Sequence, residues 1–163
     1  MLHPYPLEIT NTGYSFVTDQ GLRYQLYFLE DTSLFKEHPL LKGRAFWFNI
    51  ENTGGNYDIA VEDERIGVTV FEVLFKFFAQ QENVVIFVCD SLDNRQRARK
   101  RKFDQWFFKL NDGSLIKENG IVLSDEMEYY SGMIVHRNNP YLSKFLEAFR
   151  DLHAEMNSKD ADN

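Results

Sequence analysis

The sequence predicts an α+β fold, in which a single domain is built on a mixed, mostly antiparallel sheet. Three observations support this prediction. Pairs of short segments alternate between polar and apolar residues around turn residues, which is typical of β-hairpins. The apolar run 83–90 has the pattern of a strand that is covered on both faces. Segments with helical periodicity lie on either side of that run and again at the end of the chain.

Three strands are predicted in the first third of the chain. Residues 14–18 and 22–29 alternate in polarity on either side of a turn in which Gly21 is expected to have positive φ, so they form a predicted hairpin. Residues 45–52 form the third strand. For the polar connection 30–44, a short helix and an ordered loop both remain open.

The first helix is predicted at residues 70–80. Thr69 and Glu72 stand at the two reciprocal positions of a capping box, which marks a helix N-terminus. Val68 and Val73 flank them at the positions of a hydrophobic staple. Apolar residues almost encircle this helix, and we therefore expect it to be mostly buried.

The remaining strands complete a β-β-β-α-β-α-β-β-α order. Because a helix joins the strand at 45–52 to the strand at 84–90, these two should be parallel neighbours with a right-handed crossover. Residues 113–122 and 126–136 resemble two strands of a second hairpin, so the other strands should be antiparallel.

A last helix is predicted to begin at Asn139-Pro140 and to pack one apolar stripe against the sheet. The polar tail 157–163 is expected to be disordered, which leaves one domain over residues 1–156.

Composition agrees with a single core, since 44% of the 163 residues are hydrophobic and 15% are aromatic. With one cysteine, no secretory signal and no apolar run of spanning length, the chain is expected to be cytoplasmic without membrane association.

The second predicted helix, which runs from Asp93 to Leu110, is unusually basic. Asp93 and Gln96 have the spacing of another capping box. Six of the eight residues 95–102 are Arg or Lys, although the formal net charge of the chain is −7. At 100° per residue, the aromatic residues near the helix end define a buried face that also includes Arg99. A buried charge needs a partner, and Asp90 is the first candidate for a structural ion pair with Arg99, with Glu72 second.

The other side of this helix is the candidate binding surface. Its predicted binding residues are Arg95, Arg97, Lys100, Arg101 and Phe108. One interpretation is a solvated face that balances the acidic residues of the chain. The alternatives are a recognition surface for a partner protein and, third, a nucleic-acid site formed by the four cations. Net acidity and the inward direction of most aromatics disfavour nucleic acid.

Motifs for catalysis and metal binding are missing from the sequence. The four histidines are scattered without metal-ligand spacing, so no metal site is predicted. Cys89 has no evident base and is interpreted as a buried structural thiol. These observations favour a protein without enzymatic activity.

The order of elements between residues 14 and 136 nevertheless resembles the core of the GNAT N-acetyltransferase superfamily. In that family a Gln/Arg-x-x-Gly-x-Gly/Ala loop at the start of the central helix holds the pyrophosphate of acetyl-CoA. The equivalent stretch here contains Arg65 and Gly67 at a different spacing, followed by Val68 and Thr69. The resemblance implies, as an alternative, an acyltransferase that binds acetyl-CoA at these four residues.

A second resemblance covers nearly the whole chain. The segments YSFVTDQGLRYQLYF, DERIGVTVFEVLFKFF, CDSLDNRQRARKRKF and YYSGMIVHRNNPY are similar to those of a bacterial family of unknown function. That family carries no established activity. The leading hypothesis is therefore a non-catalytic binding or regulatory module that acts through a partner, most simply a protein, with no cofactor. The sequence carries no signal for an oligomeric state.

Overall fold

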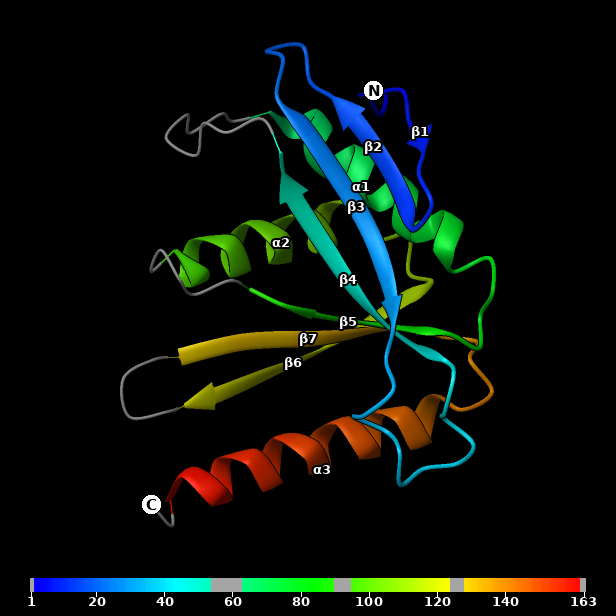
Figure 1. Cartoon of the computed structure of the whole chain (residues 1–163), viewed down its shortest axis with the longest axis vertical. Coiled ribbons are helices and arrows are strands. Elements are labelled where there is room, and N and C mark those ends of the chain that lie inside the picture. Colours follow the sequence, from blue (N-terminus) through cyan, green and yellow to red (C-terminus); the bar gives the residue numbers. More distant parts are fainter. Residues whose placement is uncertain (1, 54–62, 90–94, 124–127, 162–163) are drawn as a thin grey trace.

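The computed structural model describes residues 2–53, 63–89, 95–123 and 128–161. Within them the chain forms one seven-stranded sheet and three helices (Figure 1). The elements in chain order are β1 (Glu8–Ile9), β2 (Gly13–Val17), β3 (Arg23–Glu30), β4 (Ala45–Asn52), α1 (Glu64–Phe77), β5 (Val84–Val88), α2 (Gln96–Leu110), β6 (Leu115–Leu123), β7 (Glu128–His136) and α3 (Leu142–Ala161).

The strands follow the order β1-β2-β3-β4-β5-β7-β6 across the sheet. All neighbouring pairs are antiparallel except β4 and β5. The predicted α+β class, the parallel pair and the two hairpins are thus confirmed. The turn between β2 and β3 contains Gly21 with φ of 83°, as expected. The short strand β1 was not anticipated, because two residues are too few for an alternating pattern.

The parallel pair β4 and β5 is short for the length of its strands. It is made at Ala45↔Val84, Phe46↔Val85 and Trp47↔Ile86. Beyond Trp47 the strands diverge, and Figure 1 shows β4 turning away from the direction of β5. The sheet therefore opens at this point, between the half formed by β1 to β4 and the half formed by β5 to β7.

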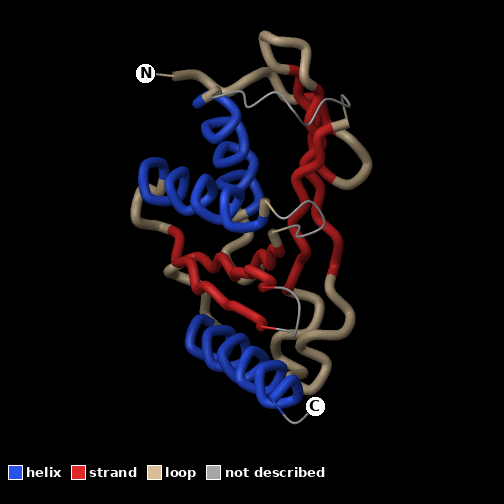
Figure 2. The backbone as a smooth tube through the Cα atoms, turned by 90° about the vertical axis from the view of Figure 1, so that its left-hand side faces the viewer, coloured by secondary structure: helices blue, strands red, loops and turns tan. Residues whose placement is uncertain are grey.

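The two faces of the sheet are covered by different helices (Figures 1 and 2). α1 and α2 pack against one face around a cluster of buried aromatic and aliphatic residues that includes Phe16, Leu26 and Phe71. α3 covers the other face around a second cluster that includes Ile86, Met133 and Phe149. The connection 31–44 is an ordered loop of turns that inserts Phe35 into the second cluster.

The start of α1 differs from the prediction. Asp63 is the N-cap, and its side chain accepts a hydrogen bond from the backbone N–H of Arg65 at 3.0 Å. Thr69 lies inside the helix, where its hydroxyl donates to the carbonyl of Arg65 at 2.7 Å. The prediction of a capping box at Thr69 and Glu72 is therefore wrong, because Asp63, six residues before Thr69, caps the helix. The carboxylate of Glu72 instead lies 3.7 Å from Nζ of Lys76.

The other two helices agree with the sequence at one end only. α2 ends at Leu110 as predicted, but it begins at Gln96, with Arg95 as an N-cap that makes no side-chain capping bond. Asp93, the predicted cap, lies outside the described residues. α3 continues to Ala161, so most of the segment 157–163, which was expected to be disordered, is helical. In the described part of the chain, we find no helix that is long and apolar enough to cross a membrane.

Candidate functional site

The outward face of α2 is the most basic surface element among the described residues. Arg95, Arg97, Arg101, Lys102 and Lys109 are all exposed. The residues Arg97, Arg101 and Phe108 fall at helical spacing on one stripe. Phe108 is 87% exposed, the highest value among the large hydrophobic side chains that the structure describes. An aromatic ring is thus presented directly to solvent on the same stripe as two arginines.

The inward face of α2 holds the helix against the protein core. Phe103 is buried, and Trp106, Phe107 and Leu110 pack against the first core cluster, as the helical angles predict. A Cβ atom on Gly67 of α1 would lie 2.5 Å from Nε1 of Trp106, so glycine is needed there for the two helices to approach. The outward residues are therefore displayed on a fixed scaffold rather than on a loop.

Two cations of the basic segment do not point outward. Arg99 is half-buried, as predicted for an inward position, but its proposed partner Asp90 lies outside the described residues. Lys100 is also half-buried, and its Nζ donates to Oδ2 of Asp104 at 2.6 Å. Lys117 of β6 pairs with the other oxygen of the same carboxylate. The structure thus places Lys100 in an internal charge network rather than on the outer stripe.

Burial disfavours the charged form of Asp104, but the hydrogen bonds from Lys100 and Lys117 outweigh this effect and hold the pKa of its carboxyl below the usual value. The neighbouring thiol of Cys89 is buried, and its pKa is raised, first by desolvation and then by the charge of Asp104. A raised pKa keeps the sulfur protonated and unreactive. Nothing in this network resembles an activated nucleophile.

The alternative cofactor residues lie in the first two turns of α1 and not in an open loop. The side chain of Asp63 occupies the N-terminus of this helix. In the cofactor alternative, a pyrophosphate would accept hydrogen bonds from the free backbone amides at this position. The guanidinium of Arg65 lies over the ring of Tyr5 at 3.8 Å and pairs with Asp19 at 3.1 Å. Gly67 and Thr69 are buried, and Val68 is partly buried. The four residues therefore belong to helix packing.

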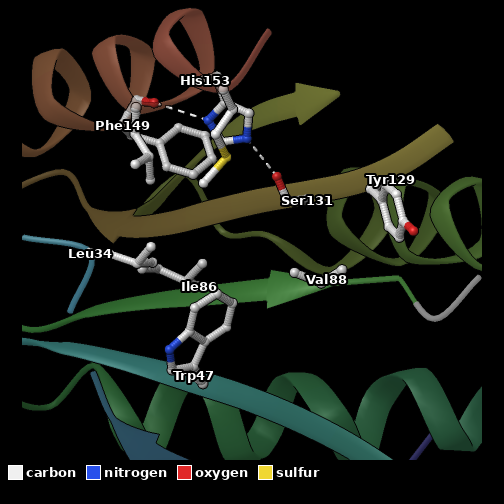
Figure 3. Close-up of a pocket in the computed structure, with 10 residues that line it drawn as sticks. Leu34, Trp47, Ile86, Val88, Tyr129, Ser131, Phe149 and His153 are labelled. Carbon is white, nitrogen blue, oxygen red and sulfur yellow. Dashed lines mark hydrogen bonds between the residues drawn. The ribbon is translucent and has the colours of Figure 1, made fainter. Parts of the chain in front are cut away.

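A cavity of about 310 Å³ lies on the opposite side of the sheet, beneath α3 (Figure 3). Its walls include Trp47 of β4, Val88 of β5, Ser131 of β7 and His153 of α3. The sequence did not predict this cavity. Its residues come from four elements and from the connection 31–44, and their individual sequence patterns are those of ordinary strand, helix and loop positions.

Metal ligands do not gather at either site. Within the residues that the structure describes, no group of three or more His, Cys, Asp or Glu side chains could hold a metal ion.

Comparison with models of protein families places most of the chain in a family. Residues 62–151, more than half of the chain, match a family described as "Family of unknown function (DUF6169)". The matched region extends from the start of α1 into α3 and includes all of the basic helix. No curated protein and no solved structure matches the chain.

Proposed function

The chain belongs to this family of unknown function, and we propose that it acts as a non-catalytic binding module that uses the outer face of α2 to hold an acidic segment of a partner protein. The observation that carries the proposal is the exposure of Phe108 on the same stripe as Arg101, on a helix that the core holds in place. Exposing a whole phenylalanine ring to water forgoes the free energy that its burial would contribute, about 2 kcal/mol.

The charge of α2 indicates the chemistry of the partner. In α2 and its N-cap, seven residues are Arg or Lys and one, Asp104, is acidic and already bound to two lysines. The remainder of the chain is strongly acidic, since the formal net charge is −7 overall. A basic stripe on an acidic protein attracts carboxylates selectively to this face and raises the association rate.

Arginine and phenylalanine are both enriched at the centre of protein–protein interfaces. Arg101 can bind a carboxylate with two parallel hydrogen bonds, while Phe108 can fill an apolar pocket of the partner. Nucleic acid is less well served, because single-stranded binding uses several aromatic platforms for successive bases. On the outer face of α2, Phe108 is the single aromatic side chain that is fully presented to solvent.

The proposal is tested first by locating the contact in the native cell. A photoreactive phenylalanine analogue at position 108 should crosslink to one partner. The same analogue at position 9 should not, although Ile9 is 85% exposed and so almost equally accessible. The crosslinked protein is then purified, and its affinity is measured directly.

With the purified partner, Phe108→Ala should weaken binding by roughly tenfold or more, as expected for a central anchor, and Ile9→Ala should leave it unchanged. Arg101→Glu should slow association and reduce its dependence on salt, whereas Lys144→Glu, at an exposed site on α3, should have no effect. Equal effects of the test and control variants would refute the proposal. Tight, salt-dependent binding of an oligonucleotide that Arg101→Glu abolishes would identify nucleic acid as the ligand instead.

A further inference from the structure

We propose that the cavity beneath α3 is a binding site for a small, neutral, aromatic molecule. This site is separate from the outer face of α2, since α2 and α3 cover opposite faces of the sheet (Figure 2). The cavity lies where β4 and β5 cease to pair, just beyond Trp47↔Ile86.

One wall of the cavity is held in place before any ligand binds. The indole Nε1–H of Trp47 donates to Oδ1 of Asp31 at 3.2 Å. Asp31 is buried, and its Oδ2 accepts a second hydrogen bond from the backbone of Leu34 at 2.9 Å. This bonding fixes the plane of the indole ring, which lies on the side of the cavity opposite α3 (Figure 3). A preorganised aromatic wall lowers the entropic cost of binding.

The opposite wall is equally ordered. Nδ1 of His153 lies 3.0 Å from the carbonyl oxygen of Phe149, which can only accept, so Nδ1 carries the hydrogen in the neutral ring. Nε2 is then the acceptor for the hydroxyl of Ser131 at 2.7 Å. The ring rests over Gly120, where a Cβ atom would lie 2.0 Å from Nε2. Because Ser131 and His153 satisfy each other, they present little polarity to the cavity.

The apolar side chains at this cavity are more exposed than their chemistry favours. Val88 is 49% exposed, and Tyr129 and Met156 are also among the exposed large hydrophobic residues. All three line the same space. A ligand that covers them would remove this apolar surface from water, which is favourable in proportion to the area buried.

The size and lining of the cavity define the ligand class. Its volume of about 310 Å³ is at the lower end for small-molecule sites and about twice that of a cavity that holds one benzene, which corresponds to roughly ten to twelve non-hydrogen atoms. Among the described residues, no Asp, Glu, Lys or Arg lines it, so these walls offer a charged ligand nothing to compensate for its lost hydration. Rings from Trp47, Phe149 and His153 favour a flat aromatic ligand by stacking.

The test uses 2-naphthol as the probe and follows the ¹³C-methyl signals of Val88 and Met156 by NMR. We expect saturable shifts of these methyl groups and none at Val17, which is 40% exposed on β2. Val88→Trp should fill the cavity and weaken binding at least about tenfold, whereas Val17→Trp should not. Met156→Trp blocks the site from α3 and serves if Val88→Trp fails to fold.

Three outcomes would overturn the inference: no saturable shift at Val88 and Met156, equal binding by the blocked and control variants, or tighter binding of dodecanoate than of 2-naphthol at the same methyl groups. The last result would assign the cavity to an acyl chain.

Discussion

The two faces of the sheet bury similar residues but enclose them differently. On the face covered by α1 and α2, the centroid of the Phe71 ring lies about 6 Å from the ring centroids of three other phenylalanines, Phe75, Phe103 and Phe107. On the face covered by α3, Phe149 is just as buried, yet it borders a cavity of about 310 Å³. The comparison indicates that the first face is built for stability and carries its exposed residues outside, whereas the second retains space within.

The largest expected effect tests this difference directly. Phe71→Ala should reduce the free energy of unfolding by about 4–5 kcal/mol and Phe149→Ala by about 3 kcal/mol, because a side chain beside empty space has fewer contacts to lose. Both values come from urea unfolding monitored by circular dichroism. A larger loss for Phe149→Ala would contradict the comparison.

A second pair of variants compares the tight glycine contacts of the two faces. Gly67→Ala forces a methyl group against the indole of Trp106 between two packed helices, and we expect a net loss of about 1–2 kcal/mol after the gain in helix propensity. Gly120→Ala should cost less, about 1 kcal/mol or below, because the methyl group meets only the end of the His153 side chain, which can turn toward the cavity at the loss of its hydrogen bond to Ser131. Thermal unfolding of the two variants gives the order of the two losses.

The charge network beneath α2 predicts a pH dependence for the first face. The folded pKa of Asp104 lies below its unfolded value, so its contribution is present above about pH 4 and is lost as the pH falls through the folded pKa. Asp104→Asn should cost roughly 1 kcal/mol at neutral pH and progressively less toward pH 3. Urea unfolding at several pH values measures this. The exposed Glu147→Gln on α3 should show no comparable loss at neutral pH.

The smallest expected effect concerns the outside of α2. Phe108→Ala should change the free energy of unfolding by less than about 0.5 kcal/mol, because the ring is 87% exposed and is surrounded by water. The same unfolding experiment measures it. A loss comparable to that of Phe71→Ala would show that Phe108 is a structural residue, and the binding proposal would lose its main support.

Much of the fold could be predicted because its signals are local. The predicted strand 45–52 coincides with β4, and α2 ends at Leu110 as expected. Alternation identifies a strand and apolar periodicity identifies the buried side of a helix, and both depend on neighbouring residues alone. The same angular argument placed Arg101 and Phe108 outside and Phe103 inside.

The candidate sites were predicted unevenly for the same reason. The residues of the basic stripe, Arg97, Arg101 and Phe108, all lie within one short segment of the sequence. Composition and the helical angle were therefore enough to find the stripe. Lys100 was misplaced among its outward members, because the carboxylate that holds it, Asp104, is itself held by Lys117 from another element. The cavity beneath α3 could not be found, since Trp47 and His153 are brought together by the sheet and not by any local pattern.

The sequence by itself determined the α+β class, the parallel relation of the third and fourth long strands and the two-sided character of the basic helix. Tertiary structure decided where α1 begins, because Tyr5, 58 residues before Asp63, donates its hydroxyl to the capping carboxylate and its backbone N–H to Thr69. It also decided that Ser131 meets His153 over Gly120. Periodicity is a property of neighbouring residues, whereas a cap that competes with another, or a cavity between layers, depends on which distant side chains the folded chain brings into contact.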